Sequence, residues 1–162
     1  MKIRTLLALA GFAVGAALPT IAQEKEEANP FPFRAIAASP QIAQQLEAIN
    51  RQFEEAFNKH DVAAVAALFT EKATIVTPLG VFSGRDGIEK YFTDVFQRYN
   101  PSDLLTKLSY VYAFADDLCA IGGWTNTFQG VHQGGGYLIR VYTRVRDTWK
   151  IRLQVDKYPT GP

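Results

Sequence analysis

The stretch 73–88, Ala-Thr-Ile-Val-Thr-Pro-Leu-Gly-Val-Phe-Ser-Gly-Arg-Asp-Gly-Ile, sets the pattern for the whole chain. It predicts a strand, a Pro-Leu-Gly turn and a short returning strand. The glycines that follow lead into a helix expected to end near Tyr99, because apolar residues recur at helical spacing from Ile88 to Phe96.

Helices are expected before this stretch and strands after it. Ser39 and Pro40 form a helix-start signal, and Asp61 can cap a short second helix. From Asp103 onward the apolar period changes to two, which predicts strands over 104–114, 118–128, 137–146 and 149–158. The glycine-rich segment 130–136 is expected to be a flexible loop. Helices followed by an antiparallel meander are typical of an α+β domain.

The first residues have the pattern of a secretory signal peptide. A short basic start precedes an apolar run from Thr5 to Leu18, and small residues precede Gln23. We therefore expect a signal peptide over 1–22, a flexible proline-containing tether over 23–39 and a folded domain over 40–162. The mature protein would be exported to the periplasm or secreted, with no stable membrane span. An uncleaved N-terminal anchor is the alternative.

Composition excludes several classes of function. The chain has 17 basic and 16 acidic residues, and removal of Lys2 and Arg4 would leave a net charge of −1. Nucleic-acid binding is not expected, because it favours a strongly basic domain. Cys119 is the only cysteine, so no internal disulfide can form. Neither a metal site nor a cofactor is expected.

Several short motifs in this order resemble a known family. They are Phe-Asn-Lys-His-Asp at 57–61, Val-Ala-Ala-Leu-Phe at 65–69, the stretch 73–88 quoted above, and Arg-Val-Tyr-Thr-Arg-Val at 140–145. Together they are similar to the nuclear transport factor 2-like superfamily, especially its SnoaL-like and ketosteroid-isomerase-like bacterial members. The resemblance implies a cone: a curved mixed sheet wrapped around three helices, with an apolar pocket at its open end. It also implies a homodimer formed through the outer face of the sheet.

The resemblance does not extend to the catalytic residues of ketosteroid isomerases. That chemistry uses an aspartate base with a tyrosine and a protonated aspartate as the oxyanion hole. The corresponding positions fall on Phe53, Thr77 and the neighbourhood of Val141, none of which can take these roles. Isomerisation by that mechanism is therefore not expected.

Other residues are candidates for the pocket. Alternation along 118–128 and the family register place Trp124, Asn126 and Phe128 inward. A tentative alignment also turns Gln154 and Asp156 inward, although a solvated strand face is the alternative. The expected ligand-binding residues are Phe53, Thr77, Phe82, Tyr91, Trp124, Asn126, Phe128 and Gln154. Asp156 is the first candidate for acid–base work, and His132, on the glycine-rich loop, is the second.

Strict alternation also assigns the remaining strand faces. On the last strand, Trp149, Ile151, Leu153 and Val155 would share one face, opposite Lys150, Arg152, Gln154 and Asp156. On the strand before it, one face carries Arg140, Tyr142, Arg144 and Arg146. We expect this face to be solvated or to form a dimer interface. A binding site for an acidic partner is the alternative.

Three functions remain open from the sequence. The first is a binding domain that holds a small, largely apolar molecule. The second is a small-molecule enzyme (an isomerase, cyclase, hydratase or oxidoreductase-like member) that uses Asp156 or His132. The third is an interaction module in which the dimerised sheet matters more than the pocket.

Overall fold

The computed structural model describes the backbone of residues 36–158 and the side chains in that range other than 36 and 131–134. The three helices are α1 (Pro40–Asn58), α2 (Val62–Ala67) and α3 (Gly84–Tyr99). The strands are β1 (Ile36–Ala37), β2 (Phe69–Thr77), β3 (Gly80–Ser83), β4 (Pro101–Phe114), β5 (Asp117–Phe128), β6 (Val131–Val145) and β7 (Thr148–Lys157).

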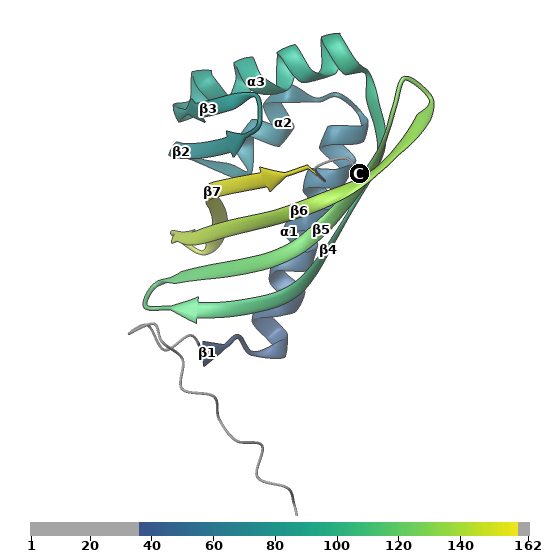
Figure 1. The fold of residues 1–162 in the computed structure, drawn as a ribbon. Helices are drawn as coiled ribbons and strands as arrows, with labels where there is room; N and C mark the ends of the chain where they lie inside the picture. The colour runs from purple at the N-terminus through teal and green to yellow at the C-terminus, as the bar shows by residue number, and fades with distance from the viewer. Residues whose placement is uncertain (1–35, 159–162) are drawn as a thin grey trace, which may run out of the picture. The chain divides into compact units, whose positions relative to one another are not determined.

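The strands form one mixed sheet in the order β1-β4-β5-β6-β7-β2-β3. All neighbouring pairs are antiparallel except β2 and β7, which are parallel. The long strands β4 to β6 bend past helix α1, and the helices lie on the concave side of the sheet (Figure 1). This confirms the α+β fold with a curved sheet around three helices.

Local sequence signals place the starts of α1 and α2 and the end of α3 where they were expected, whereas α2 ends at Ala67, before the expected Phe69. The Ser39 hydroxyl accepts a hydrogen bond from the Ile42 amide at 3.4 Å, and the Asp61 carboxylate accepts one from the Ala64 amide at 2.9 Å. Helix α3 ends at Asn100, whose left-handed conformation (φ 41°) closes the last turn just before Pro101.

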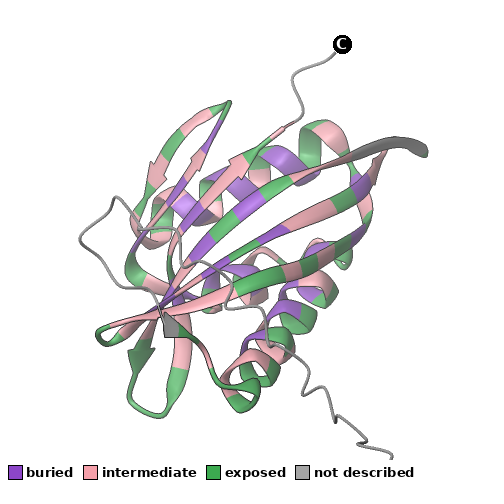
Figure 2. Ribbon diagram, turned by 60° about the horizontal axis from the view of Figure 1, so that its bottom comes forward, coloured by how far each residue is buried: buried purple, intermediate pink, exposed green. Residues whose placement is uncertain are grey.

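An aromatic core fixes the helices against the concave face of the sheet. The Phe92 ring lies 5.9 Å from Phe53 and 5.8 Å from Phe96, and Phe57 lies 5.1 Å from Phe96. Buried positions lie along one side of the helices and alternate with less buried positions along the strands (Figure 2). Among the described residues, no helix is both long and apolar enough to cross a membrane.

The segment 130–136 differs from the prediction. It was expected to be a flexible loop, but β6 begins at Val131 and pairs with β5. The turn consists of Gln129 and Gly130, with φ of 50° and 78°. Positive φ at both positions matches a type I′ hairpin, which continues the twist of the paired strands.

The predicted N-terminal features fall mostly outside the described residues. The signal peptide and residues 23–35 of the tether lie there. The end of the expected tether is attached to the domain, because Ile36 and Ala37 pair antiparallel with β4.

Two of the register shifts in the sheet bear on which side chains of β6 and β7 face the helices. Between β5 and β6, Thr125 pairs with Gly135 and Thr127 pairs with His132. Residues two apart in β5 therefore pair with residues three apart in β6, so β6 carries one extra residue. Between β6 and β7, Val141 pairs with Leu153 and Tyr142 pairs with Ile151, so β7 carries one extra residue, Arg152. Such bulges reverse the inward and outward alternation of one strand relative to its neighbour.

Candidate functional site

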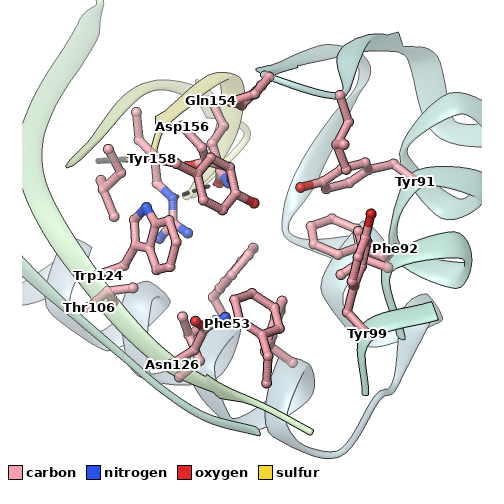
Figure 3. A pocket seen from close by; sticks show the side chains of 18 of the residues that line it. Phe53, Tyr91, Phe92, Tyr99, Thr106, Trp124, Asn126, Gln154, Asp156 and Tyr158 are labelled. Carbon is pink, nitrogen blue, oxygen red and sulfur yellow. Dashed lines mark hydrogen bonds between the residues drawn. The ribbon is translucent and has the colours of Figure 1, made fainter. Parts of the chain in front are cut away.

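A cavity of about 570 Å³ lies between helices α1 and α3 and the concave face of the sheet. Figure 3 shows side chains from both sides pointing into this space. The lining residues are Phe53, Phe57, Pro78, Leu79, Tyr91, Phe92, Val95, Tyr99, Leu104, Thr106, Trp124, Asn126, Phe128, Gln129, Leu138, Arg140, Gln154, Asp156 and Tyr158.

The helices contribute an apolar wall, which we call the helix wall and define as Phe53, Phe57, Tyr91, Phe92 and Val95. All five are buried core residues that also line the cavity. Helical spacing places the first two on one side of α1 and the other three on one side of α3. This wall can take an apolar or aromatic body but offers only the Tyr91 hydroxyl for polar contact.

The strands contribute a polar wall, which we call the sheet wall and define as Trp124, Asn126, Arg140, Gln154 and Asp156. The Arg140 Nε donates to the Gln154 Oε1 at 2.8 Å, and the Gln154 Nε2 donates to the Asp156 Oδ2 at 2.7 Å. Gln154 therefore connects a guanidinium to a carboxyl group. Because its amide oxygen accepts from Arg140, its amide nitrogen is oriented toward Asp156.

The hydrogen-bond chain continues from Arg140 to helix α1. The Arg140 Nη1 donates a hydrogen bond to the Asn50 side-chain oxygen, and the Asn50 side-chain amide nitrogen donates one to the Thr106 hydroxyl. Thr106 in turn donates to the Glu54 carboxylate at 2.5 Å. The Arg140 Cζ also lies 4.1 Å from the centre of the Phe53 ring. These contacts hold the guanidinium in one place, and Arg140 is 1% exposed.

Two polar atoms of the sheet wall have no hydrogen-bond partner among the described residues. They are the Trp124 indole nitrogen, a donor, and the Asn126 side-chain oxygen, an acceptor. A buried polar atom without a partner costs about 1–3 kcal/mol. Because Trp124 and Asn126 line the cavity, this unpartnered donor and acceptor lie next to the space that a bound molecule would fill.

Burial also changes the ionisation of the pocket. It raises the pKa of the Asp156 carboxyl, although the hydrogen bond from Gln154 and the charge of Arg140 act in the opposite direction. Burial likewise raises the pKa of the Tyr91 and Tyr158 hydroxyls, and the nearby Asp156 adds to both shifts. The two tyrosines are therefore neutral hydrogen-bonding groups, and Asp156 keeps its proton to a higher pH than an exposed aspartate.

Most of the predicted site residues line this one cavity. They are Phe53, Tyr91, Trp124, Asn126, Phe128, Gln154 and Asp156. Thr77 does not line it, and its hydroxyl accepts from the Leu79 amide at 3.1 Å in the turn after β2. Phe82 lies behind the wall, with its ring 4.7 Å from that of Tyr91. The His132 side chain lies outside the described residues, and its backbone belongs to β6 instead of a loop.

Arg140 is the main residue that the sequence prediction misplaced. It was assigned with Tyr142 to a solvated or dimer-interface face, but both are buried on the concave face. The extra residue in β6 is the reason, because it pairs Arg140 with the inward-facing Ala120 instead of Cys119. The inward orientation of Arg140 follows from the pairing register of β5 and β6, but that register depends on a bulge that the sequence pattern does not indicate. Asn50, Thr106 and Tyr158 were also missed.

Strict alternation was also wrong for β7. Ile151 and Gln154 are both buried, although their separation by three residues would place them on opposite faces of a regular strand. The extra residue in β7 near Arg152 explains the difference. Gln154 and Asp156 point inward, as expected, because both line the cavity.

A family model for the SnoaL-like domain matches residues 50–152, which carry most of both pocket walls. The chain belongs to the SnoaL-like domain family. A search of curated proteins found no match to this SnoaL-like chain.

Three solved structures with the same fold are each less than 20% identical to this chain. A Nostoc punctiforme protein of unknown function with a cystatin-like fold is 13% identical, with a TM-score of 0.69 over 78% of this chain and 98% of that one. A ketosteroid isomerase-like protein from Erwinia carotovora atroseptica is 19% identical, with a TM-score of 0.61 over 75% and 100%. A Catenulispora acidiphila protein in complex with S-DNPA is 12% identical, with a TM-score of 0.65 over 73% and 95%. Likenesses at this identity show the fold of the SnoaL-like domain and not its ligand.

Proposed function

We propose that this SnoaL-like domain binds a small, largely apolar molecule in the cavity between the helix wall and the sheet wall. The observation that carries the proposal is the pair of unpartnered atoms, the Trp124 nitrogen and the Asn126 oxygen, inside an aromatic cavity. A volume of about 570 Å³ is in the range of small-molecule sites, which combine apolar walls with a few placed polar groups. The complex of the Catenulispora acidiphila protein supports the proposal by analogy.

A fluorescent probe tests whether the cavity accepts an apolar molecule. N-phenyl-1-naphthylamine, which is neutral, should bind the purified domain with saturable fluorescence enhancement. Val95→Trp should abolish binding, because Val95 lines the cavity and is buried. Val81→Trp is the matched control, because Val81 is 66% exposed and lies outside the cavity. Equal binding by both variants would show that the probe binds elsewhere. Native mass spectrometry of gently purified protein would then identify a retained ligand.

A second candidate function is acid–base catalysis at Asp156. The observation that favours it is a carboxyl group on the cavity wall whose pKa is raised by burial and whose hydrogen-bond partner is the neutral amide of Gln154. Raised carboxyl pKa values suit a general acid or base near neutral pH. Exchange of the α-protons of 1-tetralone in D₂O, followed by NMR, should be accelerated by the wild type and not by Asp156→Asn. Failure of the wild type to accelerate exchange, with probe binding intact, would favour the binding function.

We also propose that two copies associate through the convex face of the sheet. Tyr110, Ile121 and Ile139 lie beside one another across β4, β5 and β6, and all three are exposed. An exposed row of large apolar residues is typical of a protein interface. Ile139→Lys should convert a dimer to a monomer in light scattering, whereas Arg146→Ala, in an exposed turn, should not.

Finally, we propose that the domain is exported after cleavage before Gln23. The basic start and the apolar run support this. Intact mass of protein recovered from the periplasm or medium should correspond to a chain beginning at Gln23. A full-length mass in the membrane fraction would instead support an uncleaved anchor.

A further inference from the structure

The buried guanidinium of Arg140 has no acidic partner of its own. None of the ion pairs formed by the described residues includes it. Its two hydrogen-bond acceptors, the side-chain oxygens of Gln154 and Asn50, are both neutral amides. Burial of a charge without an opposite charge is strongly unfavourable. A residue in this state on a cavity wall is suited to a ligand that supplies the negative charge.

Arg140 also belongs to the cavity wall, although it is only 1% exposed. Its Nε and Nη1 donate to Gln154 and Asn50. The second terminal nitrogen, Nη2, donates to no acidic group among the described residues, and the neighbouring group that interacts with the guanidinium is the neutral, buried Tyr142 hydroxyl. The two amides fix the plane of the group, and the Phe53 ring supports one side of it at 4.1 Å. A guanidinium held in this way is oriented for a carboxylate before any ligand arrives.

The unpartnered indole lies on the same wall. Asn50 joins Arg140 to the Thr106 hydroxyl, and Thr106 is the direct cross-strand partner of Trp124. The Trp124 nitrogen can therefore supply a second donor to an anion near the guanidinium. Asn126, two residues further along β5, presents an acceptor and would suit a hydroxyl or N–H group on the body of the ligand.

The acidic groups nearest to Arg140 in the hydrogen-bond chain do not fill this role. Asp156 is reached only through Gln154, and burial raises the pKa of its carboxyl, which favours the neutral form. Glu54 is reached only through Asn50 and Thr106, and it accepts from both the Thr106 amide and hydroxyl. Arg140 therefore remains the dominant charge on this part of the wall.

We infer that the ligand of this pocket is an organic carboxylate with an aromatic or alicyclic body, held at its acid group by Arg140 and Trp124. The inference rests on the proposed small-molecule binding and names the class of molecule. The apolar body would lie against Phe53, Tyr91 and Phe92 of the helix wall.

A matched pair of probes separates this inference from the proposed function. 2-Naphthoate and 2-naphthamide have the same rings and differ in charge, and their affinities can be measured by calorimetry at neutral pH. A charge-assisted contact predicts that the wild type binds naphthoate roughly 10- to 100-fold more tightly than naphthamide. Equal binding of the two would overturn the carboxylate inference while leaving the apolar pocket intact. Binding of neither would overturn the proposed function as well.

Variants assign the preference to Arg140. Arg140→Met should remove the preference for naphthoate while changing naphthamide affinity by less than about threefold, because naphthamide has no charge for the guanidinium to bind. Arg144→Met is the matched control, because it removes the same charge from the same strand at an exposed position over Trp149. Persistence of the preference in Arg140→Met would overturn the inference. If circular dichroism shows that Arg140→Met does not fold, Arg140→Lys should fold and show a reduced preference for naphthoate. The ratio of the naphthoate and naphthamide affinities of the wild type tests the inference in either case.

Discussion

The two walls of the pocket are built on opposite principles. The helix wall is made of core residues that would be buried in any case, and Phe92 alone packs against five other aromatic rings. The sheet wall buries a charged arginine and two polar atoms that have no partner among the described residues. The first wall therefore stabilises the fold, and the second lowers the stability of the free protein. Substitutions on the two walls should have opposite consequences.

The largest effect is expected on the helix wall. Phe92→Ala should lower the free energy of unfolding by about 3–5 kcal/mol, the usual range for a buried phenylalanine. Urea denaturation followed by circular dichroism measures this. Val81→Ala, at a position 66% exposed, is the control and should change the value by less than about 0.5 kcal/mol. A small effect of Phe92→Ala would mean that the helix wall does not stabilise the fold.

The next effect compares two asparagines that are equally buried, each 4% exposed. Asn50→Leu should destabilise the protein by about 2–3 kcal/mol, because it leaves the Arg140 Nη1 without its acceptor. Asn126→Leu should instead be neutral or stabilise by up to about 1 kcal/mol, because its oxygen has no partner to lose. Thermal unfolding of both variants provides the test. Equal destabilisation would show that Asn126 is satisfied in the free protein and not reserved for a ligand.

The smallest effect is the pH dependence contributed by Asp156. Because its pKa is raised in the folded state, the folded protein holds this proton at pH values where the unfolded chain has released it. This contribution to stability is present below the ordinary pKa of aspartate and is lost as pH rises through the raised value. Asp156→Asn should therefore gain stability relative to the wild type as pH rises from about 4 toward neutrality.

Urea denaturation across that pH range measures the difference for Asp156→Asn. Asp116→Asn, in the exposed turn between β4 and β5, is the control for removing one carboxyl group. If Asp156→Asn were less stable at neutral pH, the Asp156 charge would be stabilising the folded state, and the sheet wall would already contain the counter-charge of Arg140.

The sequence predicted the helix wall more reliably than the sheet wall. Phe53 and Tyr91 were identified because a helical period directly marks the buried side of a helix. Trp124 and Asn126 were also placed correctly, because β5 keeps its alternation between them. Arg140 was misplaced, since an arginine on an alternating strand suggests a solvent-facing side when the strand is considered alone.

The sequence by itself determined the order of helices and strands, the helix caps, the family and the aromatic composition of the pocket, because these depend on local periodicity and on residues close in the chain. Only the tertiary structure decided that Arg140 and Gln154 meet on the cavity wall and that Asn50 of helix α1 accepts a hydrogen bond from Arg140. One extra residue in β6 reverses the direction of every side chain beyond it relative to β5, and one in β7 does the same relative to β6. The residue pattern does not record such a shift, because pairing between strands depends on hydrogen bonds made across the sheet.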